Sequence, residues 1–180
     1  MRILETERLI LKPIEESDLD YLMNLRWDKE VGNYIIHQAI SKKDQLNWYN
    51  NIKNDLALSV FLKENNTLKI IGTTGLYNID YRHQRAIIKF RLDKDYQGYG
   101  YAYEFMIETL KYGFDTLNLN KIVGESMEIN EKIIKTVQKA GFVVEGIQKD
   151  FYYHQGEYRN AILFGLTKQD FRKKLENDKN

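Results

Sequence analysis

Short apolar runs, some of which alternate with polar residues, predict strands along much of the chain. Runs with this pattern lie at residues 9–11, 56–63, 68–77, 86–92, 121–127, 142–154 and 157–166. Pro13 ends the first run, because proline cannot donate a hydrogen bond to a strand ladder. Asn65-Asn66 and Gln155-Gly156 are the turn residues expected between successive strands, and the second pair predicts a hairpin.

Apolar residues at helical spacing predict four helices. They begin near Ser17, Ser41, Gly100 and Asn130, and Gly141 is the expected end of the last. The first is expected to end near Trp27, and the second carries Leu46, Tyr49 and Ile52 on its apolar side. The helix at residues 100–114 has the strongest apolar stripe, formed by Ala102, Phe105, Met106, Leu110 and Phe114. In the fourth helix, the apolar side is Ile133, Ile134, Val137 and Ala140.

The order of these elements predicts a mixed α/β sheet with helices on both faces. With a single proline and no internal repeat, residues 1–180 are interpreted as one domain with a polar tail from about Lys173. A chain of 180 residues of which 43% are hydrophobic can bury a substantial core.

Charge and composition exclude several classes of protein. The 27 basic residues balance 26 acidic ones, which argues against a general nucleic-acid binder because that role needs a basic excess. The absence of cysteine removes disulfides, thiolate zinc sites and cysteine nucleophiles. No apolar run approaches the ~18–20 residues of a membrane helix, and the first residues carry acids where a signal peptide needs apolar ones. We therefore expect a cytoplasmic protein that binds neither nucleic acid nor membranes.

The histidines give no indication of a metal site. His37, His83 and His154 are scattered, and no His/Asp/Glu spacing matches a set of metal ligands. We expect no bound metal and interpret these side chains as ordinary surface residues.

The most specific local motif is Gln97-Gly98-Tyr99-Gly100-Tyr101-Ala102, between a strand and the strongest helix. A glycine-rich turn that opens a helix directs backbone amides at one point and forms an anion site without basic residues. The spacing lacks the third glycine of a dinucleotide fingerprint and the Lys-Ser/Thr of a phosphate loop. It indicates a phosphate-bearing ligand, although a simple turn before a helix explains the same residues.

This motif resembles the pyrophosphate-binding signature of the GCN5-related N-acetyltransferase (GNAT) family, whose members bind acetyl-CoA. Residues 6–13 resemble the first strand of the branch that contains ribosomal-protein N-terminal acetyltransferases and spermidine acetyltransferases. Residues 130–132 with 139–142, and residues 145–146 with 156–161, resemble the later helix and the closing hairpin. The length and Tyr158-Arg159-Asn160-Ala161 look most similar to the spermidine or diamine group.

The resemblance implies a mostly antiparallel central sheet in which two middle strands splay apart, and it implies acetyl-CoA as co-substrate. Backbone groups around Phe90, Arg91 and Leu92 would bind the pantetheine arm, and an amide near Leu92 would polarise the thioester carbonyl. The loop amides of Gln97, Gly98, Tyr99, Gly100, Tyr101 and Ala102 would hold the pyrophosphate. Asn130 would contact the cofactor from the other strand of the splay. Relatives often form dimers or larger rings.

Two positions depart from the family pattern. Relatives often carry a glutamate where this chain has Ile87 and a tyrosine where it has Val137. Some ribosomal-protein acetyltransferases place the base five residues before the asparagine, which is Glu125 here, so Glu125 is the candidate catalytic base. The alternative is a solvated acid at a strand end. Tyr34, Tyr77, Tyr152, Tyr153 and Tyr158 are candidates to replace the missing acid, although each is more simply a cover for the rim of the core.

Two charged stretches also have two interpretations each. The acids in residues 15–20 would suit a polyamine, or they are a helix start favoured by the helix dipole. Arg82, His83, Arg85 and Lys89 would meet the 3′-phosphate of coenzyme A or an anionic acceptor, or they are the polar side of a strand edge.

The leading hypothesis is an N-acetyltransferase that transfers acetyl from acetyl-CoA directly to a primary amine. A small amine (a polyamine, an amino sugar or a drug amine) is favoured over a protein N-terminus. The first alternative is an acetyl-CoA-binding regulator with little or no transferase activity, and the second is an interaction domain whose glycine loop is only a turn. The sequence does not identify the acceptor, the oligomeric state or the use of longer acyl groups.

Overall fold

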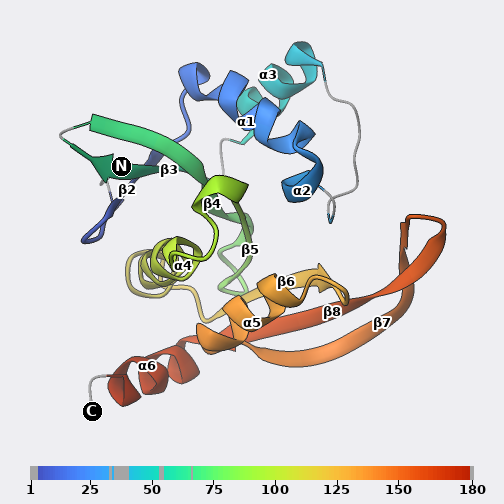
Figure 1. Cartoon of the computed structure of the whole chain (residues 1–180). Helices are drawn as coiled ribbons and strands as arrows, with labels where there is room; N and C mark the ends of the chain where they lie inside the picture. Colours follow the sequence, from blue (N-terminus) through green and yellow to red (C-terminus); the bar gives the residue numbers. More distant parts are fainter. Residues whose placement is uncertain (1–3, 33, 35–40, 53–54, 66, 179–180) are drawn as a thin grey trace. The chain divides into compact units, whose positions relative to one another are not determined.

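The computed structural model describes residues 4–32, 34, 41–52, 55–65 and 67–178. It divides into two compact units (Figure 1). The first unit contains Met1–Asn78 and Lys89–Thr109, and the second contains Ile79–Ile88 and Leu110–Asn180. Strand β5 and helix α4, defined below, therefore each contribute residues to both units.

Hydrogen bonds connect eight strands in the order β1-β2-β3-β4-β5-β6-β8-β7. The strands are β1 (Leu4–Glu5), β2 (Leu9–Pro13), β3 (Leu56–Glu64), β4 (Thr67–Asp80), β5 (Arg85–Leu92), β6 (Lys121–Met127), β7 (Val143–His154) and β8 (Glu157–Thr167). The pairing of β5 with β6 is parallel, and β1–β2, β2–β3, β3–β4, β6–β8 and β7–β8 are antiparallel. The predicted mixed, mostly antiparallel sheet is confirmed.

The described residues also form six α-helices and three short helical turns. The helices are α1 (Leu19–Trp27), α2 (Lys29–Gly32), α3 (Lys42–Asn51), α4 (Tyr101–Lys111), α5 (Glu131–Lys139) and α6 (Lys168–Asn177). The turns are η1 (Glu16–Asp18), η2 (Lys94–Tyr96) and the π-helical η3 (Tyr112–Thr116). None of the described helices is both long and apolar enough to span a membrane.

The core of the first unit forms between its strands and α4. Leu9 and Leu11 of β2 are fully buried, and so are three successive residues of β3 (58–60) and Phe105 and Met106 on the apolar stripe of α4. Burial of such side chains stabilises a fold by about 1.5–3 kcal/mol each. The hydroxyl groups of Thr74 and Thr109 lie 3.1 Å apart in this core, so two buried polar groups satisfy each other.

Helices α1 and α3 enclose a second apolar cluster of the first unit. Ile14, Leu19, Leu22 and Ala57 are buried there, and Trp48, Tyr49, Ile52 and Tyr77 pack against them. The prediction that Leu46 lies on the apolar side of α3 is wrong, because 37% of Leu46 is exposed, whereas the neighbouring Gln45 is buried.

The predicted caps of these two helices differ in outcome. The prediction for Ser41 is confirmed, since its Oγ accepts a hydrogen bond from the amide of Asp44. Ser17 was predicted to cap the first helix but lies inside η1, where Glu15 and Asp18 form the capping box instead.

Aromatic pairs stabilise the core of the second unit. The rings of Phe114 and Phe171 lie 5.2 Å apart, and those of Phe142 and Phe164 pack edge to face at 5.5 Å. Phe171 belongs to α6, which continues past Lys173, where the sequence predicted only a polar tail. Thr167 caps this helix through its Oγ1, and the buried Phe171 anchors it, which explains why a strongly polar segment is ordered.

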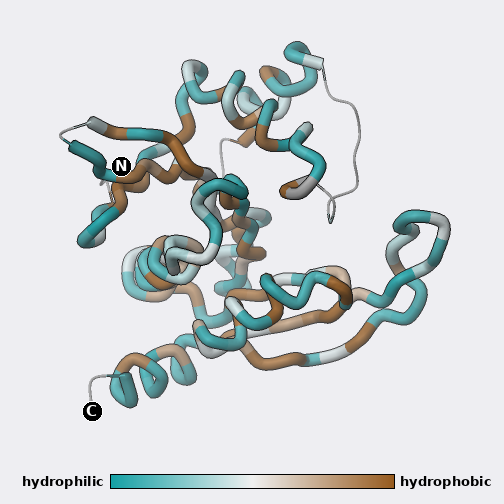
Figure 2. The backbone as a smooth tube through the Cα atoms, viewed as in Figure 1, coloured by the Kyte–Doolittle hydropathy of each residue, from teal (hydrophilic) through white to brown (hydrophobic). Residues whose placement is uncertain are grey.

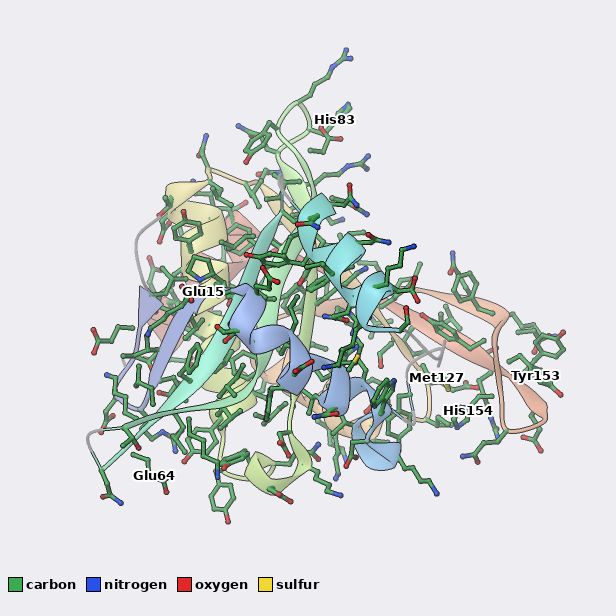
Figure 3. All side chains as sticks on the ribbon, turned by 90° about the horizontal axis from the view of Figure 1, so that it is seen from above. Glu15, Glu64, His83, Met127, Tyr153 and His154 are labelled. Carbon is green, nitrogen blue, oxygen red and sulfur yellow. The ribbon has the colours of Figure 1, made fainter. Side chains whose placement is uncertain are left out.

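Strands β7 and β8 form the predicted long hairpin, whose tip is largely hydrophilic (Figures 1 and 2). Gln155 and Gly156 both have positive φ, at 51° and 89°, as a two-residue hairpin turn of the primed type requires. Figure 3 shows Tyr153 near this tip and His83 in the turn between β4 and β5.

Candidate active site

The glycine-rich loop lies in the first unit, between η2 and α4. Gly98 and Gly100 have φ values of +87° and +83°, a conformation that residues with a Cβ rarely adopt. A Cβ at Gly98 would meet nothing within 4 Å, so its glycine is required by backbone conformation and not by crowding. Helix α4 begins directly after Gly100, and the carbonyl of Gly100 accepts the first helical hydrogen bond from Glu104 at 3.1 Å. The first amides of α4 therefore have no partner within the helix, and such a terminus attracts anions.

Arg8, which directly precedes β2, fixes this loop. Its Nη1 donates to the carbonyl of Tyr99 at 3.0 Å, and its Nε donates to Oε2 of Glu104 at 2.7 Å. The guanidinium also lies 4.5 Å from the centre of the Tyr101 ring. The Arg8 side chain thus contacts Tyr99 in the loop and both Tyr101 and Glu104 in the first turn of α4.

Glu104 would repel an anion at the helix N-terminus if its charge were not balanced. Its Oε1 accepts from the hydroxyl of Thr6 at 2.5 Å, and its Oε2 is paired with Arg8. Burial would raise the pKa of Glu104, but the hydrogen bonds from Thr6 and Arg8 outweigh burial and lower it. The carboxylate is held charged by its own partners, so the helix amides are not needed to stabilise it.

The end of β5 leads into the loop. Phe90 packs edge-on against Phe105 at 6.0 Å, and Leu92 is buried. Asp93 donates its amide to the carbonyl of Ile71 at 2.9 Å, and a Cβ at Gly72 would collide with the carbonyl oxygen of Arg91. Arg91 has the opposite side-chain direction to Phe90 and Leu92, because neighbouring residues of a strand alternate.

The register of β5 and β6 shows where these strands stop pairing. The parallel ladder joins Arg85, Ala86 and Ile87 to Lys121, Ile122 and Val123, and includes no residue beyond them. Each strand continues for several residues after that point. This ending of the ladder is what the predicted splay between two middle strands requires.

Glu125 lies on β6 in the second unit, after the point where the ladder ends. Its side chain is exposed, whereas Ser126, which points to the opposite face, is buried. The hydroxyl of Tyr152 on β7 donates to Oε1 of Glu125 at 2.8 Å. Burial and the adjacent carboxylate raise the pKa of Tyr152, so the phenol keeps its proton at neutral pH. The sequence identified both residues but not their contact. The position of Tyr152 along β7 depends on a register shift between Gln148 and Tyr152, which the sequence did not predict.

Asn130 is the N-cap of α5, and its Oδ1 accepts from the amide of Ile133 at 3.4 Å. The oxygen is used by the helix, so Nδ2 is the group of Asn130 that suits a cofactor. Val137 on the same helix is 1% exposed and belongs to the core of the second unit, whereas Ile87 on β5 is partly buried. Both departures from the family pattern are therefore apolar side chains with a packing role.

The two charged stretches have distinct structural roles. Asp18 accepts from the hydroxyl of Ser59 at 2.7 Å, and Asp20 pairs with Lys42 at 2.8 Å, which favours the helix-start interpretation of the acids. Of the predicted basic group, Lys89 belongs to the first unit, and Arg82, His83 and Arg85 belong to the second. In the second unit, His83 and Arg85 both contact Asp80, whereas Arg82 has an exposed side chain.

The described residues contain no group of three or more His, Asp or Glu side chains that could hold a metal ion. His37 lies outside the described residues, His83 lies in the turn between β4 and β5, and His154 is the last residue of β7. Tyr153 and Tyr158 are exposed, and their rings pack edge to face at 5.2 Å across the closing hairpin; Tyr34 is also exposed.

The comparison with known protein families decides the identity of the domain. Residues 8–143 match the model of the acetyltransferase (GNAT) domain, a match that includes Arg8, the glycine loop, Glu125 and Asn130. The chain belongs to the GNAT acetyltransferase family. Family membership confirms the predicted class of enzyme, an N-acetyltransferase.

Full-length relatives support this assignment. The chain is 32% identical over 178 residues to the uncharacterized N-acetyltransferase p20 of Bacillus licheniformis, covering 95% of this chain and 99% of that protein. It is 32% identical over 162 residues to the spermidine N(1)-acetyltransferase of Escherichia coli K12, covering 89% and 87%. The fold resembles the crystal structure of the Vibrio cholerae spermidine N-acetyltransferase in complex with CoA and spermine, with a TM-score of 0.85, 23% identity and coverage of 93% and 99%.

Proposed function

We propose that this GNAT acetyltransferase transfers the acetyl group of acetyl-CoA directly to the primary amine of a small molecule. The glycine loop carries this proposal, because Gly98 and Gly100 leave the backbone open to an anion at the start of α4. The balanced charge of Glu104 fits a pyrophosphate at the same place. Spermidine acetyltransferases among the relatives support a small amine as acceptor.

The residues of this chain account for each requirement of the reaction. The loop amides of residues 97–102 would bind the pyrophosphate, and the backbone of residues 90–92 would hold the pantetheine arm. An alkyl amine with a pKa near ~10.4 is mostly protonated at neutral pH, so a base must remove a proton before attack. Glu125 would accept that proton, directly or through a water molecule, and Tyr152 orients its carboxylate.

The bond changes balance without a further reactant. The amine nitrogen forms a bond to the thioester carbon, the carbon–sulfur bond breaks, and coenzyme A leaves as a thiolate. A thiol pKa near ~8.5 lets the thiolate leave before it is fully protonated. The proton taken by Glu125 then returns to sulfur or to solvent, so the reaction does not need the tyrosine that Val137 replaces.

The direct test measures release of the coenzyme A thiol from acetyl-CoA with spermidine, spermine, amino sugars, aminoglycosides and N-terminal peptides as acceptors. The cysteine-free chain adds no thiol of its own. Release with a small amine supports the proposal, and release only with peptides contradicts the preference for small amines. CoA binding without release from any acceptor would favour the alternative, an acetyl-CoA-binding regulator.

A variant of the loop distinguishes the enzyme and the regulator, which both bind CoA, from an interaction domain that does not bind it. Gly100→Glu places a carboxylate against the pyrophosphate, so we expect calorimetric CoA binding to be lost. Gly156→Glu is the matched control, because it introduces the same side chain at a glycine of similar positive φ in the distal hairpin turn. Equal CoA affinity in the two variants would contradict the proposal that this loop binds the cofactor.

A further inference from the structure

Two arginines of the first unit, one on α1 and one on β5, are near enough for the charge of one to act on the other. Arg26 is in the last turn of α1, and Arg91 is on the side of β5 opposite to Phe90 and Leu92. The Nε atoms of both are buried and have no hydrogen-bond partner among the described residues. A buried donor without a partner loses its hydration and gains nothing in exchange.

The charges of these arginines repel each other. Burial, and then the neighbouring charge of Arg26, lower the pKa of Arg91 to about 10, and burial also lowers that of Arg26. Within the described part of the chain, neither guanidinium forms an ion pair with a carboxylate. Asp55, a carboxylate near Tyr77, accepts a hydrogen bond from the amide of Asn78 at 2.8 Å instead.

Two aromatic rings and a third cation belong to the same region of the first unit. Arg26 lies 5.2 Å from the Trp48 ring, and the Nζ of Lys89 lies 5.5 Å from the Tyr77 ring. Lys89 and Arg91 are two residues apart on β5, so their side chains leave the strand on the same face. The aromatic faces partly stabilise the cations, but they supply no acceptor for the guanidinium N–H groups.

Helix α1 is held in place relative to the end of β5 by two contacts within the same unit. The hydroxyl of Tyr21 donates to Asp93 at 2.7 Å, and Lys94 pairs with Asp28 at 3.0 Å. The proximity of Arg26 and Arg91 therefore follows from a fixed arrangement, and an arrangement that keeps two like charges together is unfavourable unless an anion joins them.

We propose that Arg26 and Arg91, with Lys89 beside them, bind a carboxylate or phosphate group on the amine acceptor, so that the preferred acceptor is an anionic amine and not a polyamine. Guanidinium groups match the planar, two-oxygen geometry of both anions. The alternation of side chains along β5 supports this, because it places Lys89 and Arg91 on the same face as Ile87. Ile87 stands where relatives often carry a glutamate. The proposal rests on the proposed acetyl transfer and names its class of substrate.

The test uses pairs of acceptors that differ mainly in charge. The first pair is 4-aminobutanoate and 1,4-diaminobutane, and the second is glucosamine 6-phosphate and glucosamine. We expect kcat/KM to be about tenfold or more higher for the anionic member of at least one pair, the difference that one charge-assisted contact supplies. The pair that shows the preference identifies the anion as a carboxylate or a phosphate. The absence of this preference in both pairs, or a preference for spermidine over every anionic acceptor, would overturn the proposal.

Arginine variants assign the preference to this site. Arg91→Gln and Arg26→Gln should remove the preference through a higher KM for the anionic acceptor while the KM for acetyl-CoA stays unchanged. Arg172→Gln on α6 makes the same charge change on an exposed side chain and should leave both values unaltered. An increase confined to the KM for acetyl-CoA would show that the arginines serve a phosphate of the cofactor, which contradicts the proposal.

A binding measurement keeps this test separate from the proposed function. If no acceptor supports thiol release, the proposed acetyl transfer fails, and thermal unfolding with added phosphate or succinate then examines the anion site alone. If the added anion raises the unfolding temperature of the wild-type protein but not that of Arg91→Gln, the proposed anion site stands. Equal increases in the two unfolding temperatures would reject the site. Because loss of an unpaired buried charge does not weaken a fold, we expect Arg91→Gln to unfold at no lower temperature than the wild type.

Discussion

The hydroxyl of Tyr152 donates a hydrogen bond to the carboxylate of Glu125 at 2.8 Å, and this contact links β7 to β6 within the second unit. It fixes one oxygen of Glu125, and the side chain as a whole remains exposed. A base with an oriented carboxylate needs less rearrangement at the moment of proton transfer.

Glu125→Gln should therefore lower kcat by about 10²–10⁴-fold at neutral pH, the usual effect of losing a general base. The amide keeps the shape and the contact with Tyr152, so the affinity for CoA should not change. Steady-state kinetics and calorimetry measure the two quantities, with Glu64→Gln at the exposed end of β3 as the control. Full activity of Glu125→Gln would remove this residue as the base.

Tyr152→Phe tests whether the phenol acts through Glu125. The variant loses the donor but keeps the ring, so we expect a decrease in kcat smaller than that of Glu125→Gln and an unchanged KM for acetyl-CoA. The double variant should be no slower than Glu125→Gln, because the tyrosine then has no carboxylate to orient. Multiplicative losses in the double variant would instead assign an independent role to Tyr152, such as protonation of the leaving thiolate.

Arg8→Gln should weaken CoA binding although no contact between Arg8 and the cofactor is required. The substitution releases the carbonyl of Tyr99 and leaves Glu104 with a less balanced charge beside the anion site. We expect a dissociation constant about tenfold higher, as loss of one partly exposed charged hydrogen bond produces. Glu104→Gln in the Arg8→Gln background should restore part of the affinity, and calorimetry of the four proteins gives the coupling. Additive effects would show that the two residues act separately.

Much of this architecture could be predicted from the sequence because local chemistry determines it. The boundaries of β6 follow from the pattern of apolar residues along the strand. The cap of α3 depends on the hydroxyl of Ser41, and the hairpin turn depends on residues that accept positive φ at positions 155 and 156. The glycine loop could be identified for the same reason, since glycine is the residue that adopts the positive φ of positions 98 and 100 without strain.

Contacts distant in sequence could not be predicted in this way. The link from Arg8 to Glu104 joins residues 96 positions apart, and neither residue is unusual in its own segment. Arg26 and Arg91 likewise belong to two segments that look ordinary, and their proximity depends on how α1 packs. Helix α6 was missed because a single apolar residue, Phe171, supplies its anchor.

Asp80 should make stability depend on pH in the acid range. Hydrogen bonds from the amide and ring of His83 lower the pKa of Asp80 to about 2, so its contribution to stability is present above the ordinary pKa of aspartate and is lost as the pH falls towards 2. Asp80→Asn should therefore unfold at a lower temperature than the wild type at pH 6, and the difference should shrink between pH 4 and pH 2. A difference that is constant across these values would show that the carboxylate charge is not involved. Asp178→Asn, at the end of α6, provides a control with the same charge change.

Val137→Tyr tests whether restoring the family's tyrosine would restore an acid to this chain. Val137 is 1% exposed, so the larger ring has no space and should cost about 1–3 kcal/mol of unfolding free energy without raising kcat. Val137→Ala should cost about 2 kcal/mol through the lost methyl groups and the cavity, whereas Val144→Ala, at a residue that is 47% exposed, should stay within about 0.5 kcal/mol. Urea unfolding of the three variants measures these costs. A faster and equally stable Val137→Tyr would show that α5 can place a phenol at the reacting sulfur, and would contradict the conclusion that packing has replaced the acid here.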